Sequence, residues 1–170
     1  METPSIHGTS IFDLTWFSNN TQLISVGADR RCLLYDISSK SVVSSAQKHT
    51  ASVKSVSLTE DSSVVASGGR DGSVYFYDPR KPLSDTIGHY KFTQNKFGGS
   101  GTASRQSLKY QLPSVTGLAF FKQHLLCVIE SHSDRISFLD LRKMGDKAKM
   151  CVDSVDNYYF KKTYGDPCTS

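Results

Sequence analysis

One pattern recurs three times along this 170-residue chain, and it limits the possible folds more than any other feature. Each occurrence opens with a His or a Gln and closes with an Asp 29 positions later. The closing Asp residues are 42 positions apart between the first two units and 62 apart between the next two, which is one period plus an insert of 20. A period of about 40 residues is typical of proteins built from repeated supersecondary units. The three units run from His7 to Asp36, from His49 to Asp78 and from Gln111 to Asp140.

Each unit contains three short apolar runs separated by turn residues, as a meander of antiparallel strands requires. In the second unit Asp71-Gly72 joins two of these runs, and Asp-Gly is a strong hairpin signal because glycine accepts a positive φ. A fourth, outer strand should follow each closing Asp, and residues 42–45 suit that place in the first unit. No stretch has a sustained helical period, so the sequence predicts an all-β fold. The expected strands cover residues 11–17, 22–27, 32–36, 53–58, 64–68, 73–78, 115–121, 125–130 and 135–140.

Composition narrows the class of protein further. A hydrophobic content of 38% and a formal net charge of +4 fit a globular chain and do not indicate a nucleic-acid binder. The longest apolar run, residues 125–129, is far shorter than a membrane span, so no membrane partner is expected. The cysteines have no zinc or redox spacing and indicate reduced thiols in an intracellular protein. They are Cys32, Cys127, Cys151 and Cys168.

The leading His, a Ser on the second strand, a Gly-rich turn with Asp and a closing aromatic-Asp pair resemble the WD40 repeat. This resemblance implies that each unit is a β-propeller blade whose His, Ser, Asp and aromatic side chains form a hydrogen-bonded network. The third unit departs from the pattern because Gln111 replaces the His, and Ser133 stands where the turn Asp belongs, with Asp134 displaced by one. We therefore expect an incomplete network there. The network is assigned to His7, Ser25, Asp29 and Tyr35 in the first unit and to His49, Ser67, Asp71 and Tyr77 in the second.

The combination of His, Ser and Asp also raises the alternative of a hydrolytic triad. Its recurrence favours a structural role, because a catalytic site occurs once whereas a structural device occurs in every repeat. The sequence also contains no Gly-rich phosphate loop and no His-Glu metal motif. We expect no catalytic residue, no metal site, no cofactor and no small-molecule ligand.

A closer resemblance is carried by IFDLTW near the start, SVKSV and GGRDGSV in the second unit, and FLDLRK at the end of the third. These segments are similar to the denticleless-type substrate receptors of cullin 4 RING ubiquitin ligases over about residues 6–143. In those receptors, two successive repeats that end in Asp-x-Arg dock onto the ligase's propeller adaptor protein. The first unit reads Asp36-Ile37-Ser38 and lacks the Arg. The resemblance therefore implies adaptor binding through Asp78, Arg80, Asp140 and Arg142.

The same resemblance implies a non-catalytic subunit in the nucleus that reaches cullin 4 through the adaptor and directs ubiquitination of replication and cell-cycle proteins. Such substrates can be carried on the sliding clamp PCNA. Residues 155–159 have the spacing of a PCNA-binding peptide, but Val152 stands where that motif requires Gln, so a strand or tail is favoured. The alternative function is a WD40 scaffold outside any ligase, in which each Arg only pairs with the Asp two residues before it.

Three repeats are fewer than the four to eight blades of a closed propeller, so the sequence predicts a partial, unclosed one. The expected boundaries are 6–46, 47–87 and 111–155 for the repeats, 88–110 for a flexible polar insert and 156–170 for a disordered tail. Residues 86–129 contain no acidic residue, which is compatible either with a contact to DNA or an acidic partner or with a solvated loop. The loop is favoured and direct DNA contact is not expected. The basic residues involved are Lys91, Lys96, Arg105, Lys109 and Lys122.

Overall fold

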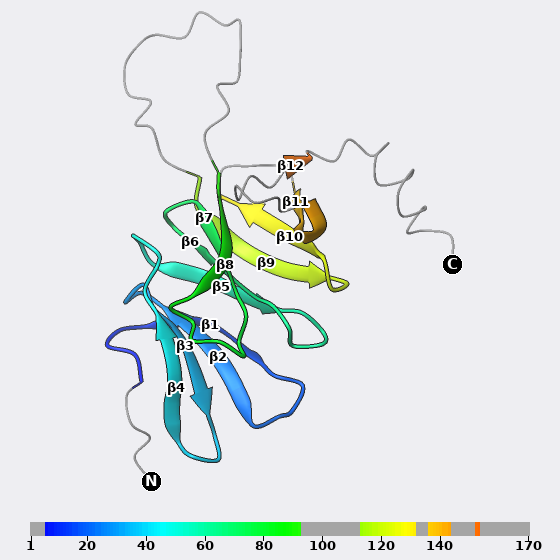
Figure 1. Cartoon of the computed structure of the whole chain (residues 1–170). Coiled ribbons are helices and arrows are strands. Elements are labelled where there is room, and N and C mark those ends of the chain that lie inside the picture. Colours follow the sequence, from blue (N-terminus) through cyan, green and yellow to red (C-terminus); the bar gives the residue numbers. More distant parts are fainter. Residues whose placement is uncertain (1–5, 93–112, 132–135, 144–151, 154–170) are drawn as a thin grey trace, which may run out of the picture.

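Twelve strands form three separate four-stranded antiparallel sheets in the computed structural model, which describes residues 6–92, 113–131, 136–143 and 152–153 (Figure 1). The strands of each sheet pair in chain order, so every sheet is a meander and corresponds to one propeller blade. Blade 1 contains β1 (Ile11–Trp16), β2 (Gln22–Gly27), β3 (Cys32–Asp36) and β4 (Ser41–Ala46). Blade 2 contains β5 (Val53–Leu58), β6 (Val65–Gly69), β7 (Ser73–Tyr77) and β8 (Thr86–Lys91). Blade 3 contains β9 (Val115–Phe121), β10 (Leu125–Glu130), β11 (Ile136–Asp140) and β12 (Val152–Asp153).

The predicted all-β fold is confirmed, and the nine expected strands lie within one residue of the observed ones. The expected outer strand of blade 1 is β4. The boundary at residue 88 falls inside β8, because Thr86–Lys91 pairs with β7 as the outer strand of blade 2. The sequence did not predict this strand because its composition is polar. An outer strand is half solvated, and along β8 exposed residues alternate with half-buried ones. The insert 88–110 is therefore wrong at its start, and residues 93–110 and the tail 156–170 lie outside the described residues.

The three blades pack face to face, and the two junctions between them hold the hydrophobic core. At the first junction, Ile24 and Leu34 of blade 1 meet Val65 and Tyr77 of blade 2. At the second junction, aliphatic and aromatic residues on the opposite side of β6 and β7 meet β9, β10 and β11. Blade 2 is thus covered on both faces, which explains why its central strands are apolar with little alternation.

A close approach of backbone to side chain fixes the spacing at the second junction. A Cβ atom added to Gly68 in β6 would lie 2.4 Å from Cγ1 of Val115 in β9. No real Cβ contact is that short, so only glycine allows blade 3 to pack this closely against blade 2. The turn that follows also needs glycine, because Gly72 has a φ of 71°.

The innermost strands β1, β5 and β9 are additionally joined by side chains that accept hydrogen bonds across the junctions. Asp13 accepts the backbone N–H of Val56 at 2.9 Å. At the next junction, Ser55 accepts the backbone N–H of Leu118 at 3.1 Å, and Ser57 accepts that of Phe120 at 3.0 Å. These bonds set the register of each blade on the preceding one.

No helix in the described part of the chain is long and apolar enough to cross a membrane. Among the same residues, no group of three or more His, Cys, Asp or Glu side chains could hold a metal ion. Cys32 and Cys127 are free thiols, and burial raises the pKa of Cys32 to about 12.

Candidate functional site

The structure brings the four assigned network residues of blade 2 together. Nδ1 of His49 lies 3.0 Å from a carboxylate oxygen of Asp71, and Nε2 lies 2.9 Å from the hydroxyl of Ser67. That hydroxyl is in turn 3.2 Å from the hydroxyl of Tyr77. All four side chains are buried, so the chain of hydrogen bonds satisfies polar groups that would otherwise be stranded in the blade.

The turn geometry explains why Asp71 remains charged in this setting. Burial by itself raises the pKa of the Asp71 carboxyl, but the hydrogen bond and electrostatic attraction of His49 and the N–H groups of Thr50 and Ser73 outweigh it. The net result is a pKa of about 2. Burial raises the pKa of Tyr77, so its hydroxyl stays protonated. The network therefore holds a charged Asp71 carboxylate and a protonated Tyr77 hydroxyl within one chain of buried hydrogen bonds.

Blade 1 repeats only part of this network. His7 lies 2.9 Å from Asp29 and 2.8 Å from Ser25, as in blade 2. Tyr35 is half-buried, and in the described part of the chain no hydrogen bond joins its hydroxyl to Ser25. The reason is that Tyr35 lies on the face of blade 1 that no other described blade covers, whereas Tyr77 is pressed against blade 1.

Blade 3 replaces the network with apolar packing. Strand pairing places Val128 where blade 2 has Ser67, and Leu139 where it has Tyr77. Both residues are fully buried at the second junction. Gln111, Ser133 and Asp134, on which the expectation of an incomplete network rested, lie outside the described residues. Sequence reasoning missed Val128 because β10 is offset by one residue from the 62-residue spacing of the closing Asp residues.

The two Asp-x-Arg endings form the same bidentate pair in successive blades. In blade 2, Nε and Nη2 of Arg80 donate to the two carboxylate oxygens of Asp78 at 2.8 and 2.9 Å. In blade 3, Nε and Nη2 of Arg142 donate to Asp140 at 2.9 and 2.7 Å. The backbone N–H of each Arg also donates to its Asp at 3.0 Å. Each guanidinium is therefore held in one orientation at the end of the third strand of its blade.

This pairing leaves both Arg side chains largely exposed. The exposed fraction is 75% for Arg80 and 55% for Arg142, whereas the paired Asp side chains are 12% and 13% exposed. The hydrogen bond from the Arg is the main cause that lowers the pKa of Asp78, and likewise that of Asp140. An oriented, exposed guanidinium can donate to carboxylates and carbonyls of a docked protein with little loss of side-chain entropy.

The first blade lacks this fork, as its sequence predicts. Ser38 stands where the Arg would be, and Asp36 instead accepts the backbone N–H of Ser39 at 2.9 Å and a side-chain N–H of Gln22 at 3.2 Å. Those bonds lower the pKa of Asp36. The closing Asp of the repeat therefore has two roles. Asp36 caps a turn in blade 1, whereas Asp78 and Asp140 each orient an Arg in blades 2 and 3.

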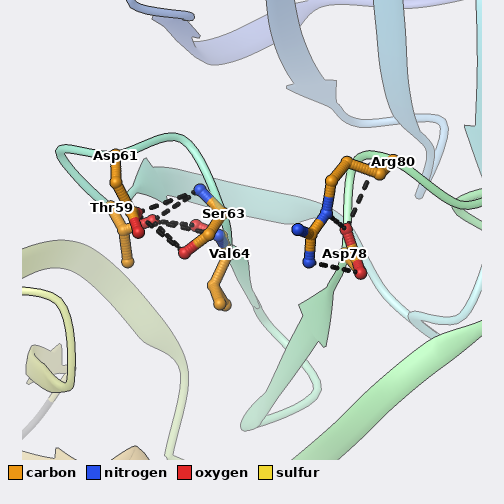
Figure 2. Close-up of polar contacts among 6 residues, drawn as sticks. All are labelled: Thr59, Asp61, Ser63, Val64, Asp78 and Arg80. Carbon is orange, nitrogen blue, oxygen red and sulfur yellow. Dashed lines mark hydrogen bonds and ion pairs between the residues drawn. The ribbon is translucent and has the colours of Figure 1, made fainter.

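The polar turn between β5 and β6 lies beside Arg80; the sequence predicts a turn at residues 60–62 but not its link to Arg80. Figure 2 shows Thr59, Asp61 and Ser63 on one side and the Asp78–Arg80 pair on the other. Asp61 accepts the hydroxyl of Ser63 at 2.7 Å, which is the main cause that lowers the pKa of Asp61, and its charge also raises the pKa of Arg80. The Asp-x-Ser spacing of this turn could have predicted the cap. In blade 3 the corresponding turn contains His124, which contributes electrostatically to the lowered pKa of Asp140.

Comparison with known proteins identifies the repeats. The family model for the WD domain, G-beta repeat, matches residues 2–36 and 40–78, which contain the first two units. The crystal structure of the Cps50 (Swd1) β-propeller domain of Myceliophteria thermophila superposes with a TM-score of 0.66 and 14% identity. The superposed region is 93% of this chain and 44% of the Cps50 chain. This match confirms the partial propeller.

Curated proteins with similar sequences carry the name Denticleless. Denticleless protein homolog A of Xenopus laevis is 28% identical over 117 residues, or 66% of this chain. Protein lethal(2)denticleless of Drosophila melanogaster is 28% identical over 157 residues, or 82% of this chain. The human Denticleless protein homolog is 26% identical over 102 residues, or 59% of this chain. The chain spans 16%, 20% and 14% of the lengths of these three relatives.

Proposed function

We propose that this WD40-repeat chain is the adaptor-docking part of a substrate receptor of a cullin 4 RING ubiquitin ligase. Arg80 and Arg142 are its docking residues, oriented by Asp78 and Asp140. The observation that carries the proposal is the repetition of one exposed Asp–Arg fork, with the same three hydrogen bonds, in two successive blades. The similarity to Denticleless proteins and the resemblance of the Asp-x-Arg endings to denticleless-type receptors support it.

A two-point contact is the physical basis of the proposed docking. Each fork lies at the end of the third strand of its blade, so both guanidinium groups are presented from the same end of the propeller. Arg80 uses two of its N–H groups on Asp78 and has others left for a partner. Truncation of a charged group at a desolvated interface costs about 2–5 kcal/mol of binding free energy. Loss of both forks should therefore abolish docking.

In this role the chain itself carries out no catalysis. Ubiquitin transfer would take place on other subunits of the ligase, reached through the adaptor and cullin 4. The substrates would be replication and cell-cycle proteins in the nucleus, including proteins carried on PCNA. The buried network of blade 2 agrees with this assignment, because His49, Ser67, Asp71 and Tyr77 are hydrogen-bonded to one another within the blade.

The test is capture of the purified adaptor protein by the immobilised chain. We expect wild type to bind and an Arg80→Ala/Arg142→Ala variant to lose capture, with Arg→Lys only partly restoring it because Lys lacks the planar fork. The matched control is Arg30→Ala/Arg70→Ala, which removes the same charge from exposed turns at the opposite end of blades 1 and 2. Normal capture by the fork variant would exclude adaptor docking at this surface.

The alternative function is a WD40 scaffold outside any ligase. One observation favours it: each Arg is already paired with its own Asp, which is what a purely structural ending would show. In that case neither wild type nor any variant captures the adaptor. The Arg variants then lose only the pairing with the Asp two residues before each Arg.

A further inference from the structure

Charge is distributed unevenly between the two ends of the described blades. The first strand of each blade begins, and the second strand ends, at the end opposite the Asp–Arg forks, which we call the basic end. Its basic side chains are exposed, except for Lys54, which is half-buried. They are Arg30 and Arg31 in the β2–β3 turn, Lys48 between β4 and β5, Lys54 in β5, Arg70 in the β6–β7 turn and Lys91 at the end of β8.

The described acidic side chains of the basic end are all bonded within the blades. Asp29 and Asp71 lie 2.9 and 3.0 Å from the network His of their own blade and are only 12% and 6% exposed. Asp13 accepts a backbone N–H inside the first junction, and Glu130 at the end of β10 accepts a side-chain hydroxyl. The opposite end has the other described carboxylates, beside its own basic residues: Asp36, Glu60, Asp61, Asp78, Asp85 and Asp140. A positive potential is therefore expected at the basic end.

An aromatic ring holds one of these cations in place. Nζ of Lys54 lies 3.4 Å from the centroid of the Phe12 ring in β1. The two residues occupy the same position in successive blades, 42 residues apart, so the contact crosses the first junction. A cation–π contact orients the ammonium group without using its three N–H donors. Lys54 is thus a positioned donor at the junction of the two blades whose turns carry the exposed arginines.

Backbone hydrogen bonds fix those two turns. The N–H of Arg70 donates to the carbonyl of Ser52 at 2.8 Å, and the N–H of Arg30 donates to that of Gly27 at 3.3 Å. Neither Arg side chain forms an ion pair with a described residue. Arg30 has a φ of 68° at the position where blade 2 has Gly72, whose φ is 71°. Blade 1 therefore has an Arg where glycine would be less strained, and the backbone gains nothing from its charge.

We propose that the basic end of blades 1 and 2 binds an acidic peptide segment of a partner protein through Arg30, Lys54 and Arg70. Guanidinium and ammonium groups donate charge-assisted hydrogen bonds to carboxylates. A peptide is favoured over a nucleic acid because the described cations gather on two adjacent blades, and a formal net charge of +4 does not indicate a nucleic-acid binder. The site lies at the opposite end from the Asp–Arg forks, so the proposal does not depend on adaptor docking.

The experiment measures binding of fluorescein-labelled decaglutamate to the full chain by fluorescence anisotropy at low and at physiological salt. Wild type should bind, and binding should weaken as salt rises, because exposed charges are screened. Arg30→Gly/Arg70→Ala should raise the dissociation constant about tenfold. These substitutions give each blade the residue that the other has at that position, Gly72 and Ala28, so the melting temperature should not fall. Lys54→Gln should weaken binding as well.

Arg80→Ala/Arg142→Ala is the matched control, because it removes the same charge from the opposite end, and it should bind decaglutamate as wild type does. Equal weakening by both double variants would show a response to net charge alone and overturn the proposal. Absence of binding by wild type, or equally tight binding of single-stranded decathymidylate, would also overturn it. Adaptor capture is measured separately and depends on the forks, so failure of either proposal is distinguishable from failure of the other.

Discussion

Asp13 and Ser55 occupy the same position in successive blades, 42 residues apart, and are hydrogen-bonded to each other across the first junction at 2.9 Å. The Ser55 hydroxyl donates to Asp13 and accepts the backbone N–H of Leu118 from blade 3. One side chain of blade 2 thus couples the inner strands of all three blades. Because an extended edge strand has unpaired N–H groups, such a relay also satisfies polar groups that would otherwise be buried without partners.

Ser55→Ala should destabilise the protein more than the same substitution at an exposed serine. The substitution removes the acceptor of Leu118 N–H and the donor to Asp13, and we expect a loss of about 1–3 kcal/mol in the free energy of unfolding. Urea denaturation measures this difference. Ser84→Ala is the control, because Ser84 is exposed and its hydroxyl donates to the neighbouring Asp85. Equal stability of the two variants would contradict the relay.

Tyr77→Phe should lower the free energy of unfolding more than Tyr35→Phe does. The Tyr77 hydroxyl is fully buried and bonded to Ser67, so its loss should lower the free energy of unfolding by about 0.5–1.5 kcal/mol. Tyr35 has the equivalent position in blade 1 but lacks that bond, so Tyr35→Phe should be nearly neutral. Thermal or urea unfolding of both variants makes the comparison. A larger loss of unfolding free energy for Tyr35→Phe than for Tyr77→Phe would contradict this prediction.

The repeats made the strands and the blade 2 network predictable, because local apolar runs, turns and a fixed spacing carry that information. What the sequence could not show was which blade faces pack against another described blade. Tyr35 and Tyr77 look equivalent in the sequence, and only packing separates them. The same holds for Asp13 and Ser55, whose bond joins residues of different repeats, and for Gly68, whose importance depends on a contact with Val115 across a junction. The β8 strand was missed because an outer strand is half solvated and its polar residues resemble a loop.

Gly68→Ala should loosen the second blade junction. The added Cβ would lie 2.4 Å from Cγ1 of Val115, so either blade 3 shifts or the core is overpacked, with a loss of roughly 1–3 kcal/mol in the free energy of unfolding. Gly8→Ala is the control, because a Cβ at Gly8 meets nothing within 4 Å. If both variants had wild-type stability, the close contact at the junction would be disproved.

Arg80→Ala should change the titration of Asp78 without unfolding the blade. The hydrogen bond from Arg80 is the main cause of the lowered pKa of Asp78, so its removal should raise that pKa toward the ordinary value of 3.8. Carboxyl chemical shifts followed by NMR over a pH series measure it. Lys81→Ala removes only a weaker electrostatic contribution and should give a smaller rise. The melting temperature should stay at its wild-type value, because the Arg80 side chain is 75% exposed.

Asp71 should give the fold a stability that depends on acidic pH. Its pKa is lowered to about 2 from an ordinary value of 3.8, so the folded state favours the charged carboxylate. A group with a lowered folded pKa contributes its full stability above the unfolded pKa, and the contribution is lost as the pH falls toward the folded pKa. Above about pH 4, wild type should therefore exceed Asp71→Asn by a constant difference in free energy of unfolding.

As the pH falls from 3.8 toward 2, that difference should shrink, because protonation of Asp71 removes the charge that His49, Thr50 and Ser73 stabilise. Urea denaturation of both proteins at a series of pH values measures it, and the difference between them cancels the contributions of the other carboxylates. A difference that stayed constant down to pH 2, or that grew on acidification, would mean that the His49–Asp71 pair does not hold the carboxylate charged in the folded blade.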